Sequence, residues 1–139
     1  MPLSLGGLAS AWALLQRPDA FGGALLVSPS LWFAPPDADA PAVRGGWITQ
    51  QFAASRPGSG RVYLAVGSLE TGPFPDSFPG VHGLSMVELA RDFRDVVTAG
   101  GLELAGYREQ PGGHNFVTAQ RVLVPGLAGL LAVGPAMSS

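Results

Sequence analysis

Three polar residues follow one another along the chain in the order serine, carboxylate, histidine, which is an order that can cleave an ester. They are Ser4, Glu70 and His114. A serine hydroxyl becomes a nucleophile when a histidine takes its proton, and a carboxylate orients that histidine and stabilises the imidazolium that forms. The pattern predicts an acyl-transfer site in which Ser4 attacks a carbonyl, His114 carries the proton and Glu70 orients His114.

The nucleophile candidate stands in a recognisable sequence motif. Ser4-Leu5-Gly6-Gly7 matches the second half of G-x-S-x-G, in which the serine occupies a sharp turn between a strand and a helix. The backbone N–H of the residue after the serine belongs to the oxyanion hole of that motif, so we assign Leu5 as an oxyanion-hole donor. Pro2 stands where the motif has its first glycine. An ordinary helix N-cap is the alternative interpretation of Ser4, because serine is a preferred residue there.

The acid and the histidine each have a competitor. Asp76 is the alternative to Glu70, and it lies in a proline-containing loop a few residues further along the chain. His82 is the alternative to His114, but it precedes a predicted helix, whereas His114 follows a predicted strand. Because ligands bind at the carboxyl edge of a parallel sheet, the topology favours His114.

Predicted helices and strands alternate along the chain. Apolar runs bounded by glycine and proline predict buried strands at residues 23–28, 61–67 and 102–107, with the third strand less apolar and nearer an edge. Apolar spacing and stop signals predict helices at residues 6–16, 43–55, 85–99 and 115–133, the last one interrupted near Pro125. Ser85 and Glu88 form a capping-box pattern at the third helix. This alternation predicts an α/β fold with a parallel sheet.

Composition limits the classes of function. The 139 residues are enough for one domain, and 47% hydrophobic with 13% charged residues is too apolar for a disordered chain. The net charge of -2 gives no reason to expect nucleic acid as a partner. No cysteine is present, which excludes disulfides and thiol catalysis. We expect no metal, no cofactor and no membrane span, because two histidines are few for a metal centre and the longest apolar stretch, residues 5–15, is short of about 20 residues.

Several blocks together resemble a known family. The chain is similar to the esterase family of the α/β hydrolases, and most similar to its branch of enterochelin and other siderophore-ester hydrolases. The resemblance is carried by Ser4-Leu5-Gly6-Gly7-Leu8, Arg17-Pro18-Asp19-Ala20-Phe21, Ser28-Pro29-Ser30-Leu31-Trp32-Phe33, Val66-Gly67-Ser68-Leu69-Glu70 and Pro111-Gly112-Gly113-His114-Asn115.

The resemblance implies a function and a site. It implies hydrolysis of a small-molecule ester, a siderophore ester or another small acyl ester, through a Ser-His-Glu triad and an acyl-enzyme intermediate without a metal. It places Trp32 near the mouth of the active site as a substrate-binding residue. Such enzymes would be expected in the cytoplasm or periplasm of a bacterium, and the sequence does not distinguish these compartments.

The resemblance also implies a domain that is only partly present. Residues 1–134 correspond to the C-terminal half of an α/β-hydrolase, with three layers and about three mainly parallel strands flanked by helices, and residues 135–139 form a disordered tail. Strands and an oxyanion loop that would precede residue 1 are missing, so we expect a truncated chain with little activity of its own. The alternative is a non-catalytic half-domain that forms a homodimer or docks with its missing N-terminal half through exposed sheet.

Overall fold

Helices and strands alternate along the chain and form the predicted α/β fold. The computed structural model describes residues 1–39 and 44–132. In chain order the elements are α1 (Leu5–Gln16), β1 (Gly23–Val27), α2 (Trp47–Ser55), β2 (Arg61–Gly67), α3 (Met86–Ala99), β3 (Glu103–Gln110) and α4 (Phe116–Leu131). The predicted tail at 135–139, and the predicted helix end at residue 133, lie outside the described residues.

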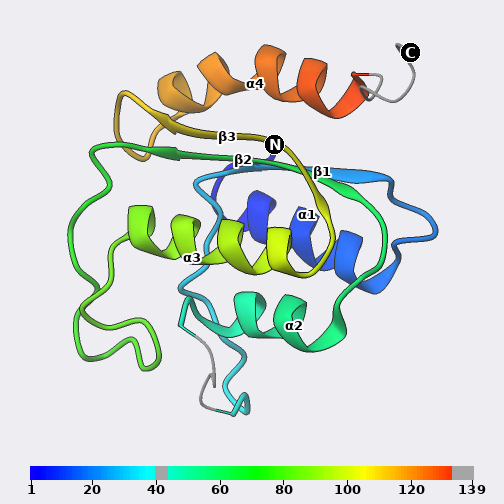
Figure 1. Cartoon of the computed structure of the whole chain (residues 1–139). Helices are drawn as coiled ribbons and strands as arrows, with labels where there is room; N and C mark the ends of the chain where they lie inside the picture. The colour runs from blue at the N-terminus through cyan, green and yellow to red at the C-terminus, as the bar shows by residue number, and fades with distance from the viewer. Residues whose placement is uncertain (40–43, 133–139) are drawn as a thin grey trace.

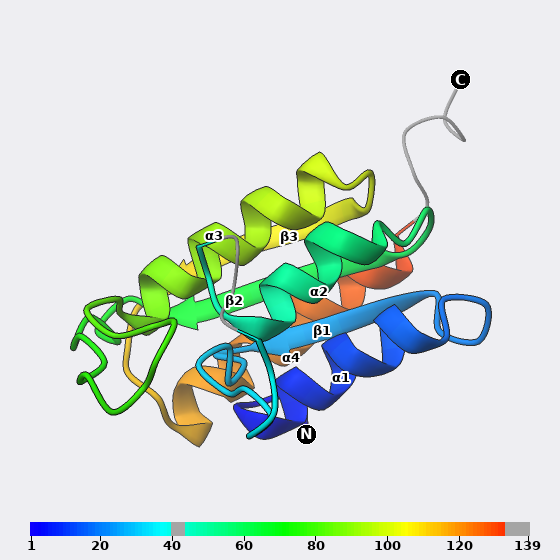
Figure 2. The same ribbon diagram turned by 90° about the horizontal axis from the view of Figure 1, so that it is seen from below.

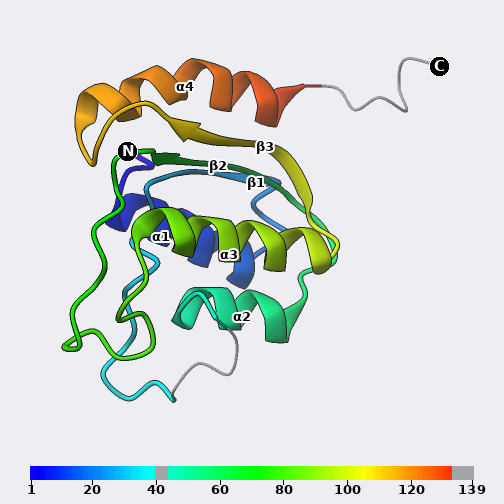
Figure 3. The same cartoon turned by 60° about the vertical axis from the view of Figure 1, so that its left-hand side comes forward.

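The three strands form one parallel sheet in the order β1-β2-β3. Helix α4 covers one face of this sheet, and α1 and α3 cover the other (Figure 1). Helix α2 packs on α1 and α3 from outside, as the view from below shows (Figure 2). The carboxyl ends of the strands, the start of the chain and the loop before α3 all lie on one side of the molecule (Figure 3). That side is where a ligand site is expected in a parallel sheet.

Apolar side chains on both faces of the sheet form two cores. The central strand β2 is hydrogen-bonded to a neighbour on each edge, and helices cover both of its faces, so its sequence is a continuous apolar run. Between the sheet and α1, α2 and α3, the aromatic rings of Phe52 and Phe93 meet edge to face at 5.1 Å. On the opposite face, α4 buries Ala119 and Val122 against the sheet. Packing in these two cores holds the strands in place, and with them the carboxyl ends of the strands, where the candidate site residues lie.

Two predicted boundaries were wrong by a few residues. Helix α2 begins at Trp47 rather than at residue 43, because Gly45 and Gly46 have φ angles of 115° and 93° and cannot continue a right-handed helix. Strand β3 extends to Gln110 instead of ending at residue 107, because its pairing with β2 continues as far as Gly67. The turn that leads to His114 therefore begins at Pro111.

The prediction of an interruption in the last helix was also wrong. Helix α4 is continuous through Pro125. Residues on both sides of the proline, Val122 and Gly126, are buried, and a Cβ at Gly126 would lie 2.5 Å from the side chain of Leu25. Close packing on the sheet therefore holds the helix together across a residue that would break it in isolation.

Candidate active site

Glu70 and His114 are brought together at the carboxyl edge of the sheet. Glu70 follows β2 and His114 follows β3, and His114 Nδ1 lies 2.6 Å from Glu70 Oε1. The Glu70 side chain is 5% exposed, whereas that of His114 is 42% exposed. A buried carboxylate thus holds one nitrogen of an imidazole whose other side faces solvent.

The Glu70 carboxylate is fixed by further hydrogen bonds on its second oxygen. Oε2 accepts one from the Gly67 backbone N–H at 2.7 Å and one from the Ser28 hydroxyl at 2.5 Å. Gly67 ends β2, and Ser28 directly follows β1. A Cβ at Gly67 would lie 2.8 Å from this same oxygen. A glycine is therefore needed where the strand end approaches the carboxylate.

Ser4 occupies a sharp turn between a short parallel bridge and helix α1. Leu3 pairs with Val27 as a bridge, and Ser4 follows with φ 59° and ψ -119°. A positive φ is uncommon for a residue with a Cβ, and such strained residues cluster at functional sites. The turn is held by hydrogen bonds from Ser4 N–H to the Val27 carbonyl and from Ser30 N–H to the Ser4 carbonyl, both 3.0 Å. Ser4 thus combines a positive φ angle with a sharp turn between a paired residue and a helix.

The hydroxyl of Ser4 contacts a second serine rather than the histidine. Ser4 Oγ lies 3.1 Å from Ser30 Oγ. Among residues 1–39 and 44–132, no hydrogen bond joins Ser4 to His114, and His114 Nε2 has no hydrogen-bond partner. The structure thus brings Glu70 and His114 into contact and leaves Ser4 without a hydrogen bond to His114.

The remaining predicted residues fall into different places. Leu5 is the first residue of α1, so its N–H has no acceptor within the helix and lies at the positive end of the helix dipole. Asp76 and His82 are exposed residues of the loop before α3, and neither contacts the Glu70–His114 pair.

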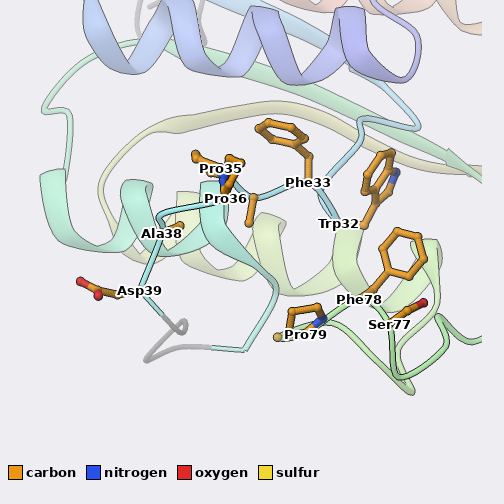
Figure 4. Close-up of a pocket in the computed structure, with 11 residues that line it drawn as sticks. Trp32, Phe33, Pro35, Pro36, Ala38, Asp39, Ser77, Phe78 and Pro79 are labelled. Carbon is orange, nitrogen blue, oxygen red and sulfur yellow. The ribbon is translucent and has the colours of Figure 1, made fainter.

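Two hollows meet at Trp32. A shallow depression of about 310 Å³ is lined by Trp32 together with Glu70 and His114, and also by Gly72, Phe74 and Met86. A cavity of about 550 Å³ also has Trp32 in its wall (Figure 4). It is lined by Trp32, Phe33, Ala34, Pro35, Pro36, Ala38, Asp39, Ser77, Phe78, Pro79 and Gly80. Trp32 therefore belongs both to the depression over the acid–histidine pair and to the larger cavity.

Two kinds of feature are absent from the part of the chain that is described. Across residues 1–39 and 44–132, no three side chains of His, Asp or Glu come together as a metal site. No helix within these ranges combines the length and the apolar character that crossing a membrane requires.

The sequence interpretation gave no role to three residues that shape this site. Ser28 and Ser30 are 1% and 0% exposed, and each directs its hydroxyl to a member of the predicted triad. In the sequence, these two serines flank Pro29 at the end of a predicted strand, and this pattern could have drawn attention to them. Phe78, whose ring lies edge to face on Trp32 at 5.6 Å, comes from a loop without any periodic pattern that could have identified it.

Comparison with known proteins identifies relatives of the chain. The model of the family described as "Putative esterase" matches residues 3–130. An iron(III) salmochelin esterase of Escherichia coli O6:H1 is 32% identical over 76 residues, which cover 52% of this chain and 19% of that protein. The chain thus matches about a fifth of the length of this curated relative. No solved structure matches the chain significantly.

Proposed function

The chain belongs to the putative esterase family, and we propose that its site hydrolyses small carboxylic esters through a serine nucleophile. The single observation that best supports this mechanism is the 2.6 Å contact between Glu70 Oε1 and His114 Nδ1. A carboxylate on Nδ1 favours the tautomer that leaves Nε2 free to accept a proton. Nε2 is therefore the expected general base.

In the proposed reaction, Ser4 Oγ attacks the ester carbonyl while His114 Nε2 takes the serine proton. The Leu5 N–H donates to the oxyanion of the tetrahedral intermediate. His114 then gives the proton to the leaving alcohol, and an acyl group remains on Ser4. A water molecule, activated by the same nitrogen, hydrolyses the acyl-enzyme and restores Ser4.

The mechanism requires the Ser4 hydroxyl to move from Ser30 toward His114. Rotation about the Cα–Cβ bond of serine moves the hydroxyl among three staggered positions, so the contact with Ser30 at 3.1 Å is one of several that the side chain can make. Catalytic hydrogen bonds in the absence of substrate are often long and tighten only when substrate binds. We therefore propose that the open serine–histidine contact closes in the substrate complex.

The substrate proposed is a small-molecule ester that approaches over Trp32. The similarity to an iron(III) salmochelin esterase supports an ester of the siderophore class as one candidate. Residues 1–134 would then be the C-terminal part of a hydrolase domain.

The test is hydrolysis of p-nitrophenyl acetate by the purified protein and by Ser4→Ala. We expect Ser4→Ala to reduce turnover to the background rate, because the nucleophile is removed. Ser10→Ala is a matched control, since Ser10 lies on the same helix and donates to the Gly6 carbonyl. Equal rates for wild type and Ser4→Ala would contradict the proposed mechanism.

A second candidate is a docking role, supported by the free edge of β1. Only Val27 of β1 is paired on that side, with Leu3. Because residues alternate in direction along a strand, Gly23 and Leu25 point their backbone groups the same way as Val27, away from β2. A hollow of about 650 Å³ lies there, lined by small and apolar residues of α1, β1 and α4. Light scattering after size-exclusion chromatography tests this docking role by measuring the mass of the protein in solution. A monodisperse monomer would exclude self-association, and the absence of esterase activity in the same sample would exclude catalysis.

A further inference from the structure

The cavity beyond Trp32 has the size and lining of a small-molecule site. Its volume is about 550 Å³, within the range of about 300–1,000 Å³ of ligand pockets. Three aromatic and three proline side chains form most of its wall, as Figure 4 shows. They are Trp32, Phe33, Phe78, Pro35, Pro36 and Pro79. Proline has a fixed φ angle, so much of this wall needs little ordering when a ligand enters.

The aromatic rings of the wall lie at steep angles to one another. The rings of Phe33 and Phe78 both meet Trp32 edge to face, with centroids 6.3 Å and 5.6 Å away and interplanar angles of 71° and 86°. Edge-to-face and offset contacts are the favoured geometries between aromatic rings. An aromatic ring that enters the cavity can make such contacts with the rings of the wall.

The charged side chains in and near the cavity favour some aromatic ligands over others. Among the described residues that line it, Asp39 is the only one with an ionisable side chain. Arg44, the nearest arginine in sequence, pairs with Glu88 and Asp92 at 3.4 Å and does not line the cavity. An anion placed there would lose hydration without gaining a cationic partner, and it would be repelled by Asp39.

We propose that this cavity is a subsite for an uncharged aromatic group of the ester substrate. The proposal rests on the proposed function for the reaction itself. Trp32 lines both this cavity and the depression that holds Glu70 and His114. One end of a substrate can therefore occupy the cavity while its ester group lies over the acid–histidine pair. The subsite selects neutral aryl esters over those with a carboxylate or another anionic group at that end.

The first test measures binding and does not need catalysis. Ser4→Ala protein is titrated with methyl benzoate and, separately, with monomethyl terephthalate, and the indole N–H signal of Trp32 is followed by NMR. The second ligand keeps the methyl ester and carries a carboxylate at the opposite end of its ring. Trp32→Phe assigns that signal. We expect methyl benzoate to move the Trp32 signal and to leave that of Trp12, which does not line the cavity. Monomethyl terephthalate should bind at least about tenfold more weakly, because its charge would enter the cavity without finding a partner.

A blocked cavity provides the matched comparison. Ala38 lines the cavity, whereas Ala54 is an exposed residue of α2 outside it. In the Ser4→Ala background, Ala38→Trp should abolish the response to methyl benzoate, and Ala54→Trp should preserve it. An unmoved Trp32 signal, an unchanged response in Ala38→Trp, or equal affinity for monomethyl terephthalate would each overturn the subsite.

Kinetics separate this subsite from the proposed function. With Ser4 intact, Ala38→Trp should lower kcat/KM for p-nitrophenyl benzoate relative to p-nitrophenyl acetate by about tenfold, and Ala54→Trp should leave the ratio unchanged. If Ser4→Ala does not reduce hydrolysis, the proposed function fails, and the binding test alone decides the subsite. If hydrolysis depends on Ser4 but the ratio is unaffected by Ala38→Trp, the subsite fails and the function stands.

Discussion

The Ser28 hydroxyl donates a 2.5 Å hydrogen bond to the Glu70 carboxylate, on the oxygen that His114 does not contact. Two residues further along, the Ser30 hydroxyl lies 3.1 Å from that of Ser4. Both serines are buried, and Pro29 between them limits the backbone. One short segment thus contacts the acid with its first serine and the nucleophile with its second.

Replacing Ser28 should remove a hydrogen bond that holds the Glu70 carboxylate in position, while leaving the carboxylate itself in place. We expect Ser28→Ala to lower kcat by about tenfold to a hundredfold, the effect of losing a hydrogen bond to a charged group, with little change in KM. The proton between His114 and Glu70 should also change its low-field NMR shift. Ser30→Ala, at an equally buried serine, is the control for that signal, because Ser30 does not contact Glu70. An unmoved signal in Ser28→Ala would show that Ser28 does not position the acid.

The assignment of the acid can be tested against its competitor. Glu70→Gln keeps the shape of the side chain but can favour the wrong histidine tautomer, so we expect a loss in kcat of up to about 10⁴-fold. Asp76→Asn should leave kcat within a factor of two, because Asp76 is exposed and does not contact His114. Steady-state hydrolysis of p-nitrophenyl acetate measures both. A larger loss in Asp76→Asn than in Glu70→Gln would assign the acid to Asp76.

The order of elements and the placement of Glu70 near His114 could be predicted because they follow from local patterns. Buried parallel strands read as continuous apolar runs, and the carboxyl ends of such strands share one edge. Two residues that follow adjacent strands must therefore lie close together. The start of α2 could not be predicted as well, since it depends on the φ angles of Gly45 and Gly46, which the apolar spacing of the helix does not reveal.

The contacts of Ser4, Ser28 and Phe78 lay beyond sequence reasoning for a different reason. A hydroxyl has several staggered positions and several acceptors within reach, so its partner depends on distances of a few tenths of an ångström. Phe78 comes from an irregular loop, whose course is set by tertiary contacts such as that with Trp32. Patterns along a chain do not encode such contacts.

The capping box of α3 should make stability depend on pH. The Ser85 backbone N–H donates to Glu88, and this hydrogen bond lowers the pKa of the Glu88 carboxyl below its ordinary value of 4.5. The charged form is thus favoured in the folded state, so its stabilising contribution is present above about pH 4.5 and is lost as the pH falls through the lowered value. Glu88→Gln should cost a few tenths of a kcal/mol at pH 7 and less at pH 3. Urea unfolding at both values measures this, and a difference that is the same at both would contradict it.

The strained backbone at Ser4 predicts that the glycine and alanine variants of this residue differ in stability in an unusual order. This prediction does not depend on catalysis. At an ordinary helical position glycine is less stable than alanine by about 1 kcal/mol, and Ser10 in the interior of α1 supplies that reference through Ser10→Gly and Ser10→Ala. Ser4 has a φ of 59°, which glycine adopts readily and alanine does not. Both Ser4 variants lose the hydroxyl contact with Ser30 equally.

Their difference therefore isolates the backbone strain. We expect Ser4→Gly to be at least as stable as Ser4→Ala in urea unfolding, because relief of roughly 1–3 kcal/mol of strain offsets the conformational entropy of glycine. If Ser4→Gly were instead about 1 kcal/mol less stable than Ser4→Ala, as at Ser10, the turn would be unstrained. The case for a nucleophile elbow at this residue would then lose its structural support, whatever the activity of the chain.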